Sequence, residues 1–204
     1  MPSILDLFHA AEKLKNENRR AFKSNGLPDT VAEHSWRVCL MTLVLAATVP
    51  DINRDKCLIM ALIHDLPETY AGDVSRLDRN ARVGRHDLEK AALEKVVSSV
   101  PGGTASEITG LWLEFEEGVS HEARFVQLID RLEVLLQHNE SGVGKWSDLE
   151  KQIQYGLAEN HARRYGFLYE FALEIDAETL QLLLAAGYHP EKLSRETYQY
   201  YYGT

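Results

Sequence analysis

The chain has 204 residues, of which 45% are hydrophobic and 26% charged, a balance typical of a globular protein with a buried core. Its formal net charge of −9 gives it no general attraction to nucleic acid or to an anionic membrane, so neither is an expected partner. A phosphorylated substrate would therefore need local charges, supplied by a metal ion and a few basic side chains.

The N-terminal residues, the apolar stretches and the cysteines indicate in which cellular compartment the protein is expected. The N-terminal residues lack the basic segment and apolar core of a signal peptide. The longest apolar stretch, residues 38–49, is shorter than the roughly 20 residues that cross a bilayer. Cys39 and Cys57 lie within apolar runs and predict two buried thiols rather than a disulfide. We therefore expect a soluble, cytoplasmic protein.

Apolar residues recur at helical spacing along almost the whole chain, and no alternating strand pattern is longer than a few residues. The pattern predicts a first helix over residues 3–18 and a loop over 20–29. Thr30 and Glu33 then form a capping box that opens a helix ending near Ala47. Further helices are expected over residues 54–66, 78–99, 104–116, 121–138, 147–173 and 177–186.

Capping residues support several of these boundaries. Ser120 precedes the helix at 121, Ser147 and Glu150 form a second capping box, and Asp176 is expected to cap the last helix. The prediction is an all-α fold in a single domain over residues 1–204. Its core would cover about residues 5–175, followed by a C-terminal helix and an aromatic tail over 176–204. The sequence has neither a glycine-rich phosphate loop nor a GxSxG nucleophile motif.

His64 and Asp65 end the apolar run CLIMALIHDLP, where an imidazole and a carboxylate would both lie out of water. Buried polar groups need a hydrogen-bond partner or a metal ion. The alternative is a helix-end pair that bonds to backbone groups. The same dipeptide at His86-Asp87 lies in a charged segment, which predicts a solvated helix face.

His34 and Asp130 are two further polar residues in apolar surroundings. His34 lies in the first turn of a helix with an apolar face, and alone it indicates a buried, hydrogen-bonded histidine. Asp130 lies in RFVQLIDRLEVLLQH, where an acid is unfavourable by helix propensity and by burial. Together with His64 and Asp65, they give two imidazoles and two carboxylates on three helices, a set that predicts one divalent metal ion. Mn, Fe, Co, Ni or Zn suits such ligands better than Mg.

The order His34, His64-Asp65, Asp130 resembles the HD-domain superfamily of metal-dependent phosphohydrolases. The strings AEHSWRV, ALIHDLPETYAGD and QLIDRLEVLL are similar to its 5′-deoxynucleotidase branch, which removes phosphate from deoxynucleoside 5′-monophosphates. The resemblance covers about residues 5–175. It implies an HD-type helical bundle with a central metal site, a small-molecule nucleotide substrate and often a homodimer.

Three more site residues follow from this resemblance. Glu68 matches the HDxxE pattern of the branch and Asp73 matches its GD pair, which implies that these two acids are catalytic. Arg19, in LKNENR, matches the arginine that contacts the substrate phosphate, and a guanidinium suits that contact. The branch often has an aromatic residue directly after this arginine, whereas this chain has Arg20, which puts the preference for deoxyribose in question.

Other functions compatible with the same motif are an HD hydrolase of nucleoside triphosphates or another phosphate ester, a non-catalytic HD protein that binds metal or nucleotide, and an oxygenase with two irons. His86 and His121 lie in polar segments, which favours one metal ion over two. Trp36, Trp112 and Trp146 are expected in the core.

Overall fold

The structure, a computed structural model, describes residues 3–74, 77–78, 81 and 83–202. The chain forms two compact units. The first comprises Met1–Arg20 and Asp29–Gln127, and the second comprises Ala21–Pro28 and Leu128–Thr204. The described residues are mainly helical, with one small sheet of two strands, which confirms the all-α prediction.

The N-terminal segment differs from the single helix predicted over residues 3–18. Helix α1 (Ile4–Ala11) begins at a capping box on Ser3 and continues as the 3-10 helix η1 (Glu12–Lys15). Strand β1 (Asn18–Phe22) follows and pairs with β2 (Pro28–Thr30). The expected loop over 20–29 is therefore a hairpin, and Arg19 lies on a strand.

Helices α2 (Val31–Leu45) and α3 (Arg54–Ile63) pack against each other in the first unit. The capping box at the start of α2 is confirmed, because Thr30 and Glu33 satisfy each other's backbone donors. Helix α2 continues as the 3-10 helix η2 (Ala46–Thr48).

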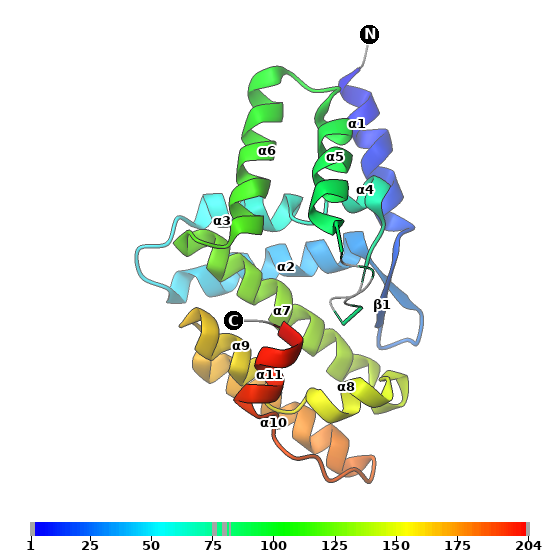
Figure 1. Cartoon of the computed structure of the whole chain (residues 1–204), viewed down its shortest axis with the longest axis vertical. Coiled ribbons are helices and arrows are strands. Elements are labelled where there is room, and N and C mark those ends of the chain that lie inside the picture. Colours follow the sequence, from blue (N-terminus) through cyan, green and yellow to red (C-terminus); the bar gives the residue numbers. More distant parts are fainter. Residues whose placement is uncertain (1–2, 75–76, 79–80, 82, 203–204) are drawn as a thin grey trace. The chain divides into compact units, whose positions relative to one another are not determined.

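The short helix α4 (Glu68–Ala71) precedes α5 (Arg85–Val97) and α6 (Gly102–Glu117). Figure 1 shows α1, α5 and α6 side by side, with α2 and α3 running across their ends. Helix α5 begins later than predicted, after Gly84, whose φ of +72° breaks the helical path. Part of the predicted 78–99 helix, residues 79–80 and 82, lies outside the described residues.

A buried cluster of Ile63, Leu93, Val97 and Trp112 joins α3, α5 and α6. Helix α7 (His121–Ser141) follows, and the hydroxyl of Ser120 accepts a hydrogen bond from the backbone N–H of Ala123, as predicted for a cap. This helix begins in the first unit and continues into the second.

The second unit contains no continuous helix over residues 147–173, so that prediction is wrong. Three helices occupy the segment: α8 (Asp148–Ile153), α9 (Leu157–Tyr165) and α10 (Tyr169–Ala185). Gly156 has a φ of +90°, and Leu168 adopts the left-handed conformation that side chains disfavour. The C-terminal helix α11 (Arg195–Tyr202) packs against α9.

Asp176 does not cap the start of a last helix. It lies inside α10, and its buried carboxylate accepts hydrogen bonds from the backbone N–H groups of Gly156, Ala158 and Glu159 at the start of α9. Burial raises the pKa of Asp176 to about 6, although these three donors act in the opposite direction. The acid therefore caps a helix that is distant in sequence.

Burial agrees with most of the sequence expectations. Trp112 and Trp146 are buried, whereas Trp36 is 66% exposed, so its placement in the core was wrong. Both cysteines are free thiols, with Cys57 buried and Cys39 half-buried. None of the described helices combines the length and the apolar character needed to span a bilayer.

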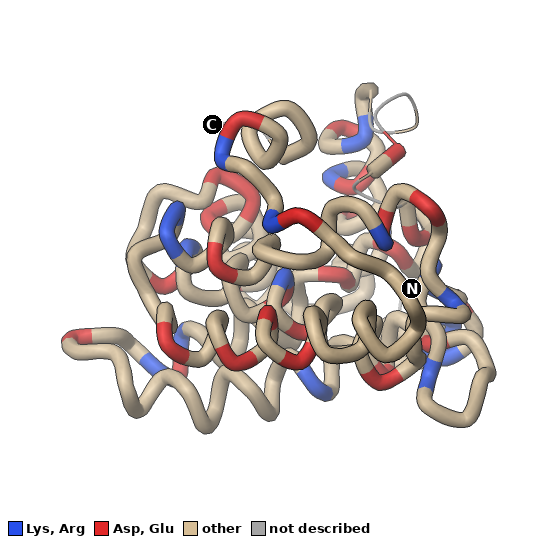
Figure 2. Tube along the Cα trace, turned by 90° about the horizontal axis from the view of Figure 1, so that it is seen from below, with Lys and Arg blue, Asp and Glu red and all other residues tan. Residues whose placement is uncertain are grey.

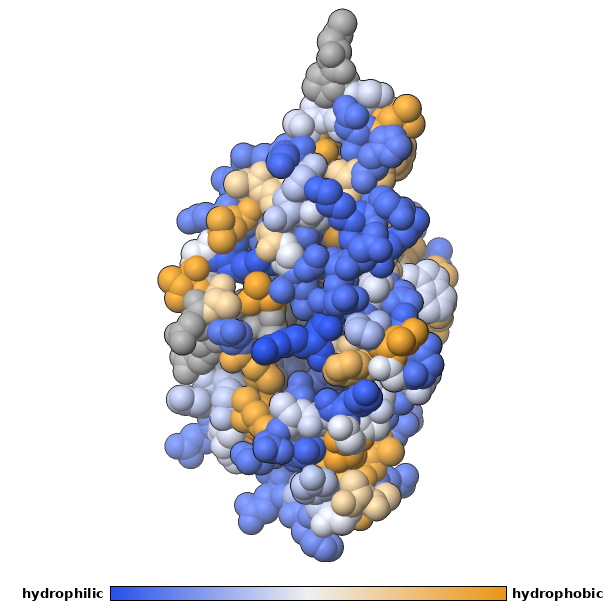
Figure 3. Space-filling model, turned by 90° about the vertical axis from the view of Figure 1, so that its right-hand side faces the viewer, coloured by the Kyte–Doolittle hydropathy of each residue, from blue (hydrophilic) through white to orange (hydrophobic). Residues whose placement is uncertain are grey.

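The surface of the described residues is mixed in character. Figure 2 shows acidic and basic residues interspersed along the helices, in keeping with 31 acidic and 22 basic residues in the chain. On the face in Figure 3, hydrophilic residues predominate and hydrophobic ones gather in small groups, one of them close to the N-terminal end. Exposed apolar residues of α1, namely Ile4, Leu5 and Phe8, lie at that end.

Candidate metal centre

The two histidines of the motif come together within the first unit. His34 lies in the first turn of α2, and His64 follows the last residue of α3. Their Nε2 atoms are 3.4 Å apart, and the residues are only 1% and 4% exposed. Two buried ring nitrogens this close together must share a proton or a cation.

The ring of His64 is held in one orientation. Its Nδ1 lies 2.8 Å from the carbonyl oxygen of Ala61, which can only accept a hydrogen bond. Nδ1 therefore carries a proton that it donates to this oxygen, and Nε2 is the ring nitrogen that faces the site. Trp112 donates to the His64 carbonyl oxygen at 3.1 Å, and the Phe115 ring packs edge-on against the imidazole. This packing fixes the direction in which His64 could bind a metal ion.

Asp65 lies beside both rings. Its Oδ2 is 3.2 Å from His64 Nε2 and 3.6 Å from His34 Nε2. Arg19 reaches the same oxygen from β1, with Nη1 at 3.2 Å. Burial alone would raise the pKa of Asp65, but the His64 ring, the His34 ring and the Arg19 guanidinium outweigh it and lower that pKa. Asp65 is thus an ionised, mostly buried ligand candidate.

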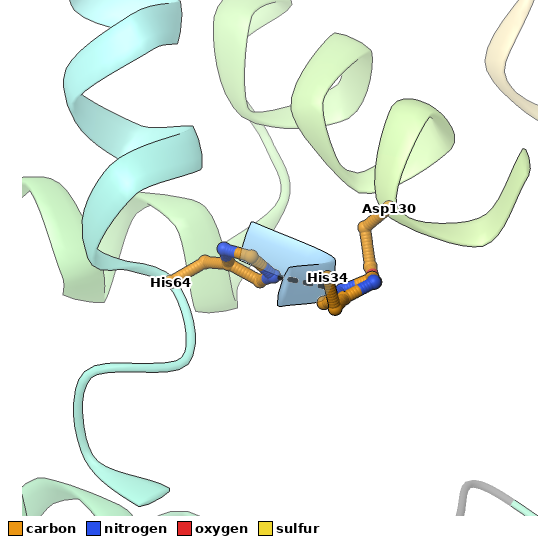
Figure 4. A group of neighbouring side chains, drawn as sticks. All are labelled: His34, His64 and Asp130. Atoms are coloured by element: carbon orange, nitrogen blue, oxygen red, sulfur yellow. Dashed lines mark hydrogen bonds between the residues drawn. The ribbon is translucent and has the colours of Figure 1, made fainter. Parts of the chain in front are cut away.

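Asp130 lies on α7 and is 5% exposed. Figure 4 shows its side chain directed toward those of His34 and His64. One ligand atom of each of these three residues lies within 4.8 Å of the others, a spacing at which a single cation can contact all of them. All three are among the four metal ligands predicted from the sequence.

Glu68 is the first residue of α4, and Asp73 follows Gly72 at the end of that helix, in the same unit. Burial, followed by repulsion from Asp65 and Asp73, raises the pKa of Glu68 well above its usual range. Its Oε2 is buried and makes no hydrogen bond to the described residues. Burial also raises the pKa of Asp73, although Arg19 opposes this shift. Two acids that are difficult to ionise therefore lie near the histidine pair, a feature common at catalytic sites.

Other candidates from the sequence lie elsewhere. His86 and Asp87 form an exposed pair on α5, as predicted. His121 is exposed at the start of α7. Glu17 and Arg85 belong to no sequence motif, yet both contact the backbone of the turn that carries Asp73. No local motif signals those contacts, because each joins segments that are distant in sequence.

The donor set fits a divalent transition metal ion. Two imidazole nitrogens and carboxylate oxygens are the ligands that Mn, Fe, Co, Ni and Zn accept together. The unsatisfied Oε2 of Glu68 adds a buried acceptor that would gain from a nearby water or cation. The residues present therefore suit the metal that the motif implies.

Comparison with known proteins gives consistent results. The chain matches the sequence model of the HD-domain family over residues 11–166. It is 30% identical over 152 residues to 5′-deoxynucleotidase HDDC2 of Xenopus laevis, covering 74% of this chain and 72% of that protein. The Bos taurus protein of the same name is 33% identical, with coverage of 74% and 71%.

A solved structure shares the fold. The crystal structure of a predicted metal-dependent phosphohydrolase from Magnetospirillum magnetotacticum superposes with a TM-score of 0.72 at 25% identity. The match covers 87% of this chain and 93% of that one. The family match spans well over half of the sequence and includes the histidine pair, Asp65 and Asp130. The chain belongs to the HD-domain family.

Proposed function

We propose that this protein is a metal-dependent phosphomonoesterase that acts on deoxynucleoside 5′-monophosphates. The observation that carries the proposal is the convergence of His34, His64 and Asp130 within 4.8 Å, next to Asp65 and two half-buried acids. The relatives named 5′-deoxynucleotidase support the substrate class. The three converging residues and Asp65 would hold one divalent ion, which would supply Lewis acidity and make water easier to deprotonate.

The proposed roles of the remaining residues follow from their chemistry. Arg19 binds the substrate phosphate through its guanidinium, which is held by Asp65 Oδ2 at 3.2 Å. Glu68 and Asp73 divide the proton transfers between them. One accepts a proton from the attacking water, and the other donates a proton to the ester oxygen as its bond to phosphorus breaks. The products are inorganic phosphate and a nucleoside.

A nucleotide screen tests the activity. The purified protein is incubated with Mn²⁺, Co²⁺ or Zn²⁺ and with deoxynucleoside and ribonucleoside mono- and triphosphates, with and without a chelator. We expect phosphate release from the 5′-monophosphates, and we expect the chelator to abolish it. Release of pyrophosphate from triphosphates would favour the alternative HD hydrolase. Nucleotide binding without any release would favour the non-catalytic alternative. Equal rates on ribose and deoxyribose nucleotides would show that the sugar is not selected, in keeping with the exposed Arg20 in place of an aromatic residue.

We also propose a homodimer. Along α2, the side chains of Trp36, Leu40 and Leu43 are exposed at helical spacing, and Leu62 of α3 is 66% exposed. The sequence pattern predicted that Trp36 is buried. In a dimer, a second copy of the chain would bury these exposed apolar side chains. One functional HD domain would then extend over residues 1–204 of each copy. Free thiols at Cys39 and Cys57 are in keeping with a cytoplasmic location.

The dimer is tested by light scattering coupled to size exclusion. We expect the wild-type protein to elute with twice the 23.1 kDa chain mass. The variant Trp36→Glu is expected to elute as a monomer, because a charge would be placed in an apolar contact. Leu88→Glu, at another exposed apolar side chain, is the control and should remain dimeric. A wild-type monomer at micromolar concentration would contradict the proposal.

A further inference from the structure

The turn that carries Asp73 needs external support. Helix α4 has only four residues and ends at Ala71, so its last carbonyl groups lack helical partners. Gly72 then adopts φ +72° and ψ 166°, a conformation that essentially only glycine reaches. Without other contacts, Asp73 would follow a flexible residue and its carboxylate would sample many positions.

Arg85 supplies that support from one side. This residue, the first of α5, is 8% exposed. Its Nη1 donates to the carbonyl oxygen of Ala71 at 2.8 Å, and its Nη2 donates to the carbonyl oxygen of Gly72. Its Nε donates to Glu89 at 2.6 Å, which fixes the plane of the guanidinium. Two donors in one rigid plane therefore orient two successive carbonyl groups.

Glu17 contacts an N–H group of the same backbone segment. Its Oε1 accepts a hydrogen bond from the N–H of Asp73 at 3.1 Å. A Cβ atom at Gly72 would lie 3.2 Å from that oxygen, closer than an ordinary van der Waals contact, so any other residue here would push the Glu17 carboxylate away. The positively charged Arg85 thus donates to the carbonyl oxygens of Ala71 and Gly72, and the negatively charged Glu17 accepts from the N–H of Asp73. This pairing defines the orientation of the peptide that joins Gly72 to Asp73.

We propose that Arg85 and Glu17 are positioning residues, which hold the backbone of Asp73 so that its carboxylate can take part in proton transfer. Neither side chain needs to touch the substrate. The inference rests on the proposed function, because it assumes that Asp73 is catalytic. A carboxylate misplaced by about 1 Å loses on the order of 100-fold in rate, so the two contacts would act mainly on kcat.

The test compares Arg85→Lys with the wild-type protein in the metal-loaded phosphatase assay. Lysine keeps the charge but lacks the planar pair of donors. We expect kcat to fall about 100-fold while KM changes less than about twofold, because the substrate contacts remain. Asp87→Asn, at a 93% exposed side chain on the same turn of α5, is the matched control and should retain the wild-type kcat. Metal content and melting temperature are measured for every variant.

A double-mutant cycle separates positioning from general damage. If Arg85 acts through Asp73, Arg85→Lys should cause no further loss of kcat in an Asp73→Asn background. Glu17→Gln keeps an acceptor oxygen and should retain most of the activity, whereas Glu17→Ala should lose it. Losses at Arg85 and Asp73 that multiply would overturn the positioning role while leaving the catalytic role of Asp73 intact. Full activity of Asp73→Asn alone would overturn the catalytic role, and the inference with it.

Discussion

Replacing His64 by alanine is expected to abolish metal-dependent phosphate release and to lower metal content in the purified protein. The variant removes a buried Nε2 that faces His34 Nε2 at 3.4 Å, in a ring already oriented by Ala61. Loss of an outer-shell partner alone costs a metal site up to about 100-fold in affinity, and loss of a ligand should cost more. Metal analysis and the phosphate assay give the two readouts.

The chain contains its own control for this experiment. His86 also precedes an aspartate, but it lies exposed on α5. His86→Ala should retain metal and activity, and we expect added Mn²⁺ to raise the melting temperature of this variant and of the wild-type protein alike. The His64→Ala protein should show no such rise. Loss of metal from the His86 variant would instead indicate a second ion, and normal metal content in His64→Ala would refute the proposed centre.

Replacing Glu68 by glutamine is expected to lower kcat by a factor between about 10² and 10⁴, the range that general acid–base groups contribute. Metal content and KM should change little, because glutamine preserves the shape of the side chain. Glu94→Gln, an exposed glutamate on α5, is the control. Unchanged turnover in Glu68→Gln would show that this acid has no catalytic role.

The same variant should be more stable than the wild-type protein when both are free of metal. Burial raises the pKa of Glu68 above its ordinary value of 4.5, so the ionised form destabilises the folded state at pH 7. Glutamine removes this cost. The gain in melting temperature should therefore be present at pH 7 and should disappear as the pH falls below about 4.5, where both states carry the proton. Lower activity combined with higher stability identifies a site residue.

The sequence was most informative where the signal is local. The capping box of Thr30 and Glu33 sets the start of α2 through residues three apart, and His34 follows in the same turn. The apolar run before His64 likewise predicted a buried imidazole, and His64 is 4% exposed. The pattern therefore predicted the all-α class and selected the residues that converge, because each choice depended on its immediate neighbours.

The predictions that failed depend on contacts between segments that are distant in the sequence. The long helix over 147–173 is interrupted at Gly156, where a Cβ atom would lie 3.1 Å from the backbone nitrogen of Leu193. Leu168 has a left-handed backbone conformation, which the sequence does not indicate because the residue is not a glycine. Arg85 appeared to be one more charged residue on a solvated helix, although its guanidinium binds carbonyl groups 13 and 14 positions earlier. Such partners are specified only once the chain has folded.

The capping of α9 by Asp176 has a consequence for synthesis on the ribosome. The start of α9 is completed by a carboxylate that lies 20 residues after Gly156, inside the following helix. An N-cap contributes about 1 kcal/mol, a large share of the stability of so short a helix. While residue 176 is still inside the exit tunnel, α9 lacks its cap. Helices α9 and α10 therefore become stable together rather than one after another.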